Sequence, residues 1–181
     1  MLKIGVLGAG HLGKIHLKQI REIPQYELAG FFDSDPAVAK KVSEEMNIPS
    51  FSSATELIKN VDIVDVVVPT VAHYEYATIA LRQFKHVFIE KPLAGTVEEA
   101  KALVALAREA NVKTQVGHVE RFNPAFLAVK DRCDQSCESQ TRHFALDFKA
   151  FSWRPVGNQA VYDRRNVAAI FGYFRNAKGR L

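Results

Sequence analysis

Residues 3–13 read KIGVLGAGHLG, in which an apolar strand pattern runs directly into Gly8-x-Gly10-x-x-Gly13 and then into a helix. Gly8 suits the tight turn off the strand, Gly10 lets backbone N–H groups approach a pyrophosphate, and Gly13 lets the helix pack close to the strand. The start of the helix adds unpaired N–H groups and the positive end of a helix dipole. The sequence therefore predicts a dinucleotide-binding site, formed by Gly8, Ala9, Gly10, His11, Leu12 and Gly13, with His11 contributing its backbone N–H.

An acidic residue follows the glycines at the spacing expected of such a site. Asp33 lies about 20 residues beyond Gly13 and directly follows the apolar run Glu27–Phe32. Its carboxylate is expected to accept hydrogen bonds from the adenosine ribose hydroxyls, and its charge would repel a 2′-phosphate. The sequence thus predicts NAD, with NADP less favoured. The alternative is a glycine-rich turn in a domain of similar fold that binds another ligand.

Composition limits the size and class of the protein. The chain has 181 residues, of which 48% are hydrophobic and 24% charged, enough for one well-buried domain and a small remainder. No run of about 18 apolar residues occurs, and the N-terminus enters a strand without a signal peptide. We therefore expect a cytoplasmic protein with no membrane partner. Cys133 and Cys137 have no further Cys or His cluster around them, so neither a disulfide framework nor a metal site is predicted.

The net charge of +4 is unevenly distributed along the chain. Residues 1–131 carry 15 Lys and Arg against 16 Asp and Glu, whereas residues 132–181 carry 9 against 4. The basic excess therefore belongs to the C-terminal segment. No nucleic-acid-binding motif accompanies it, so we expect no nucleic-acid partner and interpret the segment as a solvated or poorly ordered end.

Short apolar runs rich in β-branched residues alternate with helical patterns up to Gly117. The expected strands are Leu2–Leu7, Leu28–Phe32, Ile63–Val68, Val87–Ile89 and Lys113–Val116. The expected helices are His11–Glu22, Pro36–Met46, Ala54–Lys59, Ala72–Gln83 and Val97–Ala110, with Pro36 in a first turn and Thr96 as an N-cap. Apolar strands joined by helices predict an α/β fold, a doubly wound parallel sheet covered on both faces.

Ligands of such sheets bind outside the carboxyl ends of the strands. Pro69, Thr70 and His73 follow one predicted strand, and Glu90 and Lys91 follow the next. We therefore expect these polar groups on the cofactor side of the sheet.

The motifs GAGHLG, VVVPTVAHYEYA and IEKPLAGT resemble those of the glucose-fructose oxidoreductase/inositol dehydrogenase (Gfo/Idh/MocA) family over about residues 1–130. Members of that family oxidise or reduce sugar-like alcohols with a nicotinamide cofactor. The resemblance implies that Lys91 is a catalytic residue between the nicotinamide ribose and the substrate, where a cation stabilises developing charge. It also implies that Glu90 orients either the ribose or Lys91. The alternative for Lys91 is an exposed loop lysine paired with Glu90.

The same resemblance implies that His73 lies beside the phosphate or ribose of the cofactor. Pro69 and Thr70 would then line the same crevice. A histidine that caps the helix without contacting a ligand is the alternative for His73.

Residues 117–124, GHVERFNP, are similar to the branch of the family that acts on nucleotide-linked N-acetylated sugars, as in UDP-N-acetylglucosamine 3-dehydrogenases. The resemblance implies that Glu120, Arg121 and Asn123 meet sugar hydroxyls or a diphosphate, to which Arg is well suited. The alternative is a proline-bearing linker into the next helix.

The chain departs from the family pattern after residue 132. Members of the family continue with a second α+β domain, which carries the homo-oligomer interface and an Asp-x-x-x-His element whose histidine accepts the proton of the substrate. No such element follows Gly117 here, and His143 is the only histidine beyond residue 132. We therefore expect a chain that lacks the second domain.

The expected organisation is a dinucleotide-binding domain at 1–120, the start of an inter-domain connection at 121–133 and an atypical basic tail at 134–181. We expect the tail to be disordered, the product of a reading-frame change in a truncated gene. The alternative is a short helix near Asn166–Arg175 that packs on the first domain.

Two functions of different classes follow from the sequence. One is an NAD-dependent oxidoreductase that transfers hydride between the cofactor and a sugar or nucleotide-sugar hydroxyl. The other is a non-catalytic NAD-binding module, a truncated relative without its substrate domain.

Overall fold

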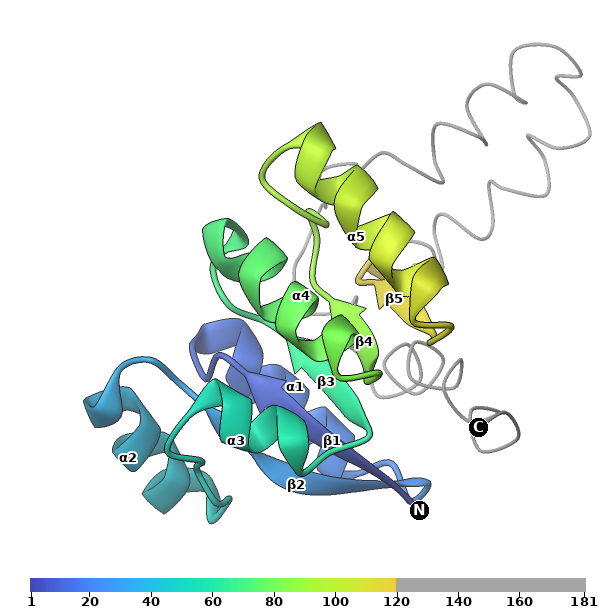
Figure 1. Cartoon of the computed structure of the whole chain (residues 1–181). Coiled ribbons are helices and arrows are strands. Elements are labelled where there is room, and N and C mark those ends of the chain that lie inside the picture. Colours follow the sequence, from blue (N-terminus) through green and yellow to red (C-terminus); the bar gives the residue numbers. More distant parts are fainter. Residues whose placement is uncertain (120–181) are drawn as a thin grey trace, which may run out of the picture. The chain divides into compact units, whose positions relative to one another are not determined.

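The computed structural model describes residues 1–119, which form one parallel five-stranded sheet with helices on both faces (Figure 1). The strands are β1 (Leu2–Leu7), β2 (Tyr26–Phe32), β3 (Ile63–Val66), β4 (His86–Ile89) and β5 (Thr114–Val116). Their order across the sheet is β2-β1-β3-β4-β5. The prediction of a doubly wound parallel α/β sheet is confirmed.

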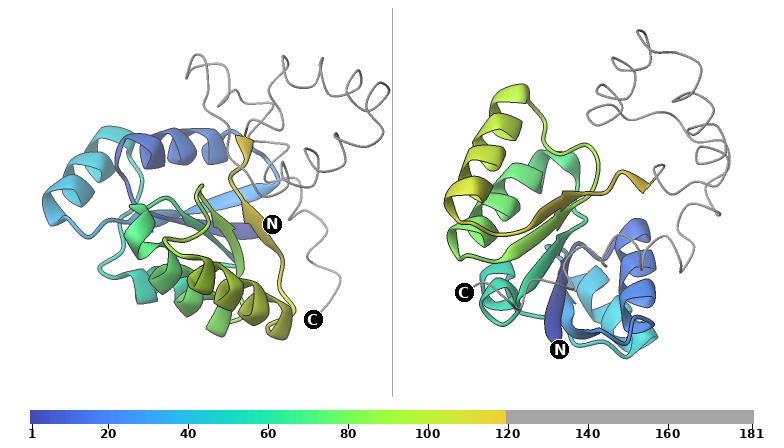
Figure 2. Two further views of the ribbon diagram at one scale, coloured as in Figure 1. Left: turned by 90° about the horizontal axis from the view of Figure 1, so that it is seen from above. Right: turned by 90° about the vertical axis from the view of Figure 1, so that its right-hand side faces the viewer.

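The helices are α1 (His11–Arg21), α2 (Pro36–Met46), α3 (Ala54–Lys59), α4 (His73–Arg82) and α5 (Val97–Glu109), with a 3₁₀ turn η1 (Thr70–Ala72) before α4. Helices α3, α4 and α5 pack together on one face of the sheet, and α1 and α2 lie on the other (Figures 1 and 2). Contacts between Lys14 and Glu45 and between Arg21 and the Met46 carbonyl join α1 to α2. None of the helices within residues 1–119 is long and apolar enough to cross a membrane.

The ends of two helices agree with their sequence signals. Asp35 caps α2 by accepting hydrogen bonds from the N–H groups of Ala37 and Val38, and Pro36 occupies the first turn. Thr96 caps α5 by accepting from the Glu99 N–H, while the Glu99 carboxylate accepts from the Thr96 N–H. These reciprocal bonds form a capping box, and they confirm the predicted N-cap at Thr96.

One predicted strand is shorter than expected. Strand β3 ends at Val66 rather than Val68, because its partner β1 ends at Leu7, opposite Val66, and the chain turns away at Gly8. The residues after Val66 therefore leave the sheet as a loop. This change matters for function, because the loop runs past Gly8, the first residue of the glycine motif.

The order of the strands creates a divergence at the carboxyl end of the sheet. The connection from β1 leads to β2 on one side, whereas β3 is followed by β4 and β5 on the other. Loops that leave neighbouring strands in opposite directions open a crevice between them. We call this side of the sheet, where the strands end, the carboxyl edge.

Candidate functional site

The first component of the site is the glycine loop, residues 8–13. Gly8 has φ +96°, and a Cβ there would lie 2.7 Å from the Val67 carbonyl oxygen. A Cβ at Gly13 would overlap the Gly8 carbonyl oxygen. Side chains at these two positions would therefore force the turn and the helix away from the sheet.

Gly10 differs from both neighbouring glycines, because a Cβ there would meet no atom within 4 Å. Gly10 is exposed and precedes α1, whose start has no side-chain cap. By contrast, side chains of Asp35, Ser53 and Thr96 cap α2, α3 and α5. The start of α1 therefore combines open space with uncapped N–H groups, an arrangement that suits an anion such as a pyrophosphate.

The second component is Asp33, which directly follows β2. Its Oδ2 accepts a hydrogen bond from the Ala9 N–H at 2.7 Å, and its Oδ1 accepts one from the Asp35 N–H at 2.9 Å. The Gly8 N–H donates to the Phe32 carbonyl at 2.8 Å. The carboxylate is thus held beside the glycine loop by two backbone groups. Because a carboxylate has about four lone-pair sites, each oxygen retains capacity to accept from a ligand hydroxyl.

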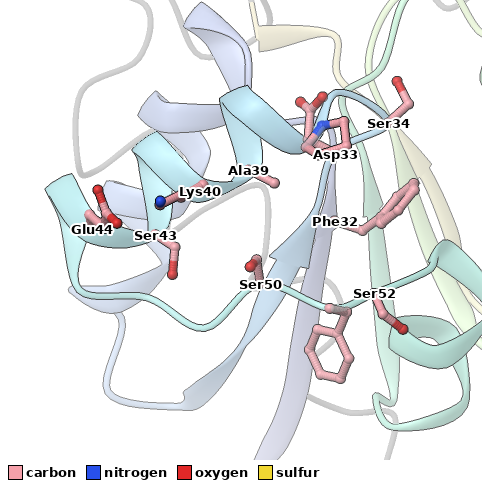
Figure 3. Close-up of a pocket in the computed structure, with 11 residues that line it drawn as sticks. Phe32, Asp33, Ser34, Ala39, Lys40, Ser43, Glu44, Ser50 and Ser52 are labelled. Carbon is pink, nitrogen blue, oxygen red and sulfur yellow. The ribbon is translucent and has the colours of Figure 1, made fainter.

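An open pocket of about 550 Å³ borders Asp33. Figure 3 shows Asp33 and Ser34 at one end of it, with Lys40 and Ser43 on α2 and Ser52 on the opposite wall. The pocket extends the Asp33 side of the site, and seven of the eleven residues that line it are polar or charged.

The third component lies at the end of β4. Glu90 is buried, and its Oε2 accepts a hydrogen bond from the backbone N–H of Lys91 at 3.0 Å. Lys91 itself is exposed. Among residues 1–119 the Lys91 ammonium forms no ion pair, so Glu90 holds the backbone of this residue and leaves its charge available.

His73, at the start of α4, faces inward with an exposed fraction of 1%. Its Nδ1 lies 2.8 Å from the Pro92 carbonyl oxygen and its Nε2 lies 2.9 Å from the Val68 carbonyl oxygen. Both ring nitrogens of His73 therefore face backbone carbonyl oxygens. His73 ties together the loops that follow β3 and β4, close to Pro69 and Thr70.

A buried charged cluster under the site was not predicted from the sequence. His16 of α1 places Nδ1 2.8 Å from Asp65 Oδ2 and Nε2 3.3 Å from Glu90 Oε1. Burial alone would lower the pKa of His16, but the attraction and hydrogen bonds of Asp65 and Glu90 outweigh it and raise this pKa to about 10. Burial raises the pKa of Asp65. We call these three residues the His16 cluster.

Sequence signals for this cluster exist in retrospect. Asp65 interrupts the apolar run IVDVVV, and every residue of β3 is buried. His16 lies one turn after Gly13 on the buried side of α1. A charged residue inside a buried strand requires a partner, which the helix supplies.

Glu120, Arg121 and Asn123, the predicted substrate residues, lie outside the described residues. The same holds for the predicted connection at 121–133 and the predicted tail at 134–181.

A family model described as "Oxidoreductase family, NAD-binding Rossmann fold" matches residues 2–118. UDP-N-acetylglucosamine 3-dehydrogenase of Acidithiobacillus ferrooxidans is 38% identical over 124 residues, which cover 68% of this chain and 39% of that protein. Its solved structure superposes with a TM-score of 0.68 at 35% identity, covering 72% of this chain and 43% of that chain.

Two further relatives extend this similarity. The scyllo-inositol 2-dehydrogenase (NAD(+)) of Bacillus subtilis is 34% identical over 137 residues, which cover 74% of this chain and 40% of that protein. Biliverdin reductase of Synechocystis, solved with biliverdin and NADP+, is 26% identical with a TM-score of 0.67, covering 72% of this chain and 42% of that chain.

The chain thus spans about 40% of the length of the curated relatives it matches. The glycine loop, the parallel sheet and the match over residues 2–118 agree, and they confirm the resemblance inferred from the motifs. The chain therefore belongs to the Gfo/Idh/MocA oxidoreductase family, through a nicotinamide-dinucleotide-binding domain of the Rossmann type.

Proposed function

We propose that residues 1–117 bind NAD and form the cofactor-binding part of an oxidoreductase that acts on a hydroxyl group of a sugar or nucleotide sugar. The observation that carries the proposal is the open start of α1 at Gly10, beside a carboxylate that is fixed by the Ala9 N–H. Relatives named for UDP-N-acetylglucosamine and scyllo-inositol supply the substrate class.

The residues present fit a dinucleotide. The uncapped N–H groups that follow Gly10 would hold the pyrophosphate, and the space where a Cβ is absent would admit it. Asp33 would accept hydrogen bonds from the adenosine ribose, with the polar pocket alongside.

The environment of Asp33 favours NAD over NADP. Two backbone N–H groups hold its carboxylate, so the side chain cannot swing away without losing both hydrogen bonds. A 2′-phosphate on the adenosine ribose would meet this fixed negative charge at close range. The 2′-hydroxyl of NAD would instead donate to it.

Lys91 is our choice for the residue at the reacting centre. When bound, the nicotinamide ring supplies hydride transfer to or from a substrate carbon. An exposed ammonium without an ion pair among the described residues could donate a hydrogen bond to the reacting hydroxyl and offset the charge that develops on its oxygen. Glu120, Arg121 and Asn123 are proposed as contacts to the sugar or its diphosphate.

The second candidate is an NAD-binding module without turnover. It uses the same glycine loop and Asp33, which hold the dinucleotide without any group at the reacting centre. This candidate and the oxidoreductase share the cofactor site and differ only in catalysis.

A paired experiment separates these functions. The full chain is titrated calorimetrically with NAD and NADP, and formation of reduced cofactor is then followed by absorbance with UDP-N-acetylglucosamine or scyllo-inositol. Turnover that Lys91→Met abolishes supports the oxidoreductase, whereas NAD binding without turnover supports the binding module. If the chain binds neither dinucleotide, both proposals are wrong.

A further inference from the structure

We propose that His16 is a positioning residue, which holds Glu90 and through it the backbone of Lys91 in a fixed relation to the glycine loop. The inference rests on the proposed function, because it assigns the His16 cluster to the nicotinamide half of the cofactor site. It adds a residue that does not touch the ligand but determines where Lys91 lies.

The geometry of the cluster spans three elements. His16 belongs to α1, the helix that begins at the glycine loop, while Asp65 belongs to β3 and Glu90 follows β4. The Nδ1 of His16 forms a hydrogen bond with Asp65 Oδ2 at 2.8 Å, and its Nε2 lies 3.3 Å from Glu90 Oε1 as an ion pair. The side chains of all three residues are at most 4% exposed. One ring thus links the helix of the glycine loop to the residue preceding Lys91.

Three neighbours confine the Glu90 carboxylate. His16 faces its Oε1, the Lys91 N–H donates to its Oε2, and a Cβ added at Gly117 would lie 2.7 Å from its Oε1. Glu90 therefore has little freedom to adopt another rotamer. A change at His16 or at Gly117 that displaces the Glu90 carboxylate would break the hydrogen bond that holds the backbone of Lys91.

Stability alone does not account for this arrangement. Apolar side chains of similar volume often stabilise a buried position as well as an ion pair does, because desolvation of the charges offsets their attraction. The charged hydrogen bond to Asp65, in contrast, fixes the distance and direction of the imidazole, and it holds Nε2 against Glu90. The specific contribution of the His16 cluster is therefore the placement of Glu90 and Lys91.

If His16 has this role, its loss should affect the binding of the two halves of the cofactor differently. ADP carries the adenosine and both phosphates, which the proposed function assigns to Asp33 and the glycine loop. NADH adds the nicotinamide and its ribose, assigned to the neighbourhood of Lys91. A loss of His16 should therefore weaken NADH binding and leave ADP binding almost unchanged, whereas general destabilisation would affect both ligands alike.

The test compares the affinities of the full chain for NADH and ADP by calorimetric titration. His16→Gln keeps a hydrogen-bonding side chain but removes the charge. We expect NADH affinity to fall about tenfold, which corresponds to about 1.4 kcal/mol, and ADP affinity to change by less than about twofold. The matched control is His86→Gln. His86 accepts a hydrogen bond from the Lys113 N–H, and it is the first residue of β4, whereas Glu90 follows the last residue of that strand. This control variant should change neither affinity.

A second variant covers the case in which His16→Gln does not fold. Gly117→Ala alters no charge, yet its methyl group would lie within 3 Å of the Glu90 carboxylate and displace it. It should produce the same selective loss of NADH affinity.

The possible results are distinct. Selective loss of NADH binding in either variant supports the positioning role. Equal losses for NADH and ADP, or no loss in a folded variant, overturn it while leaving the proposed function intact. A wild-type chain that binds neither ligand overturns the proposed function and this inference together.

Discussion

Substitution of Gly10 by alanine should separate cofactor binding from folding. Gly10 has φ −64°, a value that alanine adopts without strain, and the added methyl group would meet no atom of the protein within 4 Å. The same methyl group would occupy the space through which a pyrophosphate approaches the start of α1. The matched variant is Gly13→Ala, in which the methyl group overlaps the Gly8 carbonyl oxygen.

The structure gives opposite expectations for these two variants. At Gly10, alanine is a poorer N-cap than glycine, but it restricts the unfolded chain by roughly 0.4–1 kcal/mol, so stability should change by less than about 1 kcal/mol. Blocking one charge-assisted hydrogen bond to a phosphate costs about 1.5–3 kcal/mol, so NAD affinity should fall at least about tenfold. Gly13→Ala should instead lower stability by roughly 3 kcal/mol, because a rigid backbone oxygen stands in the way.

Thermal unfolding and calorimetric titration with NAD measure the two effects on the same preparations. Gly10→Ala should keep the wild-type Tm and lose affinity, whereas Gly13→Ala should unfold about 10 °C earlier. If Gly10→Ala binds NAD as the wild type does, the pyrophosphate does not lie at the glycine loop. A large fall in its Tm would instead show that the open space at Gly10 serves folding.

Three further outcomes follow from individual contacts. Asp33→Ser removes the fixed carboxylate, so the ratio of NADP to NAD affinity should rise about tenfold or more in paired titrations, and an unchanged ratio would refute the role of this charge. The folded-state pKa of His16 is raised from 6.5 to about 10, so the stabilisation from its charge is complete below about pH 6.5 and is lost as pH rises through 10. The free energy of unfolding, measured with urea, should therefore fall between pH 7 and 10. His16→Gln should flatten this decline. Thr96→Ala breaks the capping box of α5 and should cost about 1 kcal/mol of unfolding free energy without changing NAD affinity, because Thr96 is exposed and forms its hydrogen bonds with Glu99 in the first turn of its own helix.

Local patterns in the sequence were sufficient to predict most of the fold. Alternating apolar runs and helical segments predicted the five strands and five α-helices that residues 1–119 form, and the N-cap at Thr96 and the first-turn position of Pro36 depend on residues within one turn of each other. The end of β3 was predicted two residues too far along the chain. Its length depends on the point at which β1 turns away, which local composition does not encode.

The candidate site was predictable where its chemistry is local and unpredictable where it depends on packing. The spacing of the glycines and of Asp33 predicted the residues of a dinucleotide site, but the hydrogen bond from Ala9 to Asp33 joins residues 24 apart in the chain. His73 stays a prediction for the cofactor site, and the sequence did not indicate that its ring nitrogens face the carbonyl oxygens of Val68 and Pro92, the latter 19 residues away.

By itself, the sequence determined the parallel α/β architecture, the glycine loop and the family, because turns, caps and strand patterns act over short separations. Only the tertiary structure decided that His16 meets Asp65, 49 residues later, and that Glu90 holds the backbone of Lys91 beneath the carboxyl edge. The physical reason is that a buried charge needs a partner, and only the packing of the helix against the sheet brings that partner within hydrogen-bonding distance. That distance is set by the order of the strands and by the close approach of α1, which Gly13 permits.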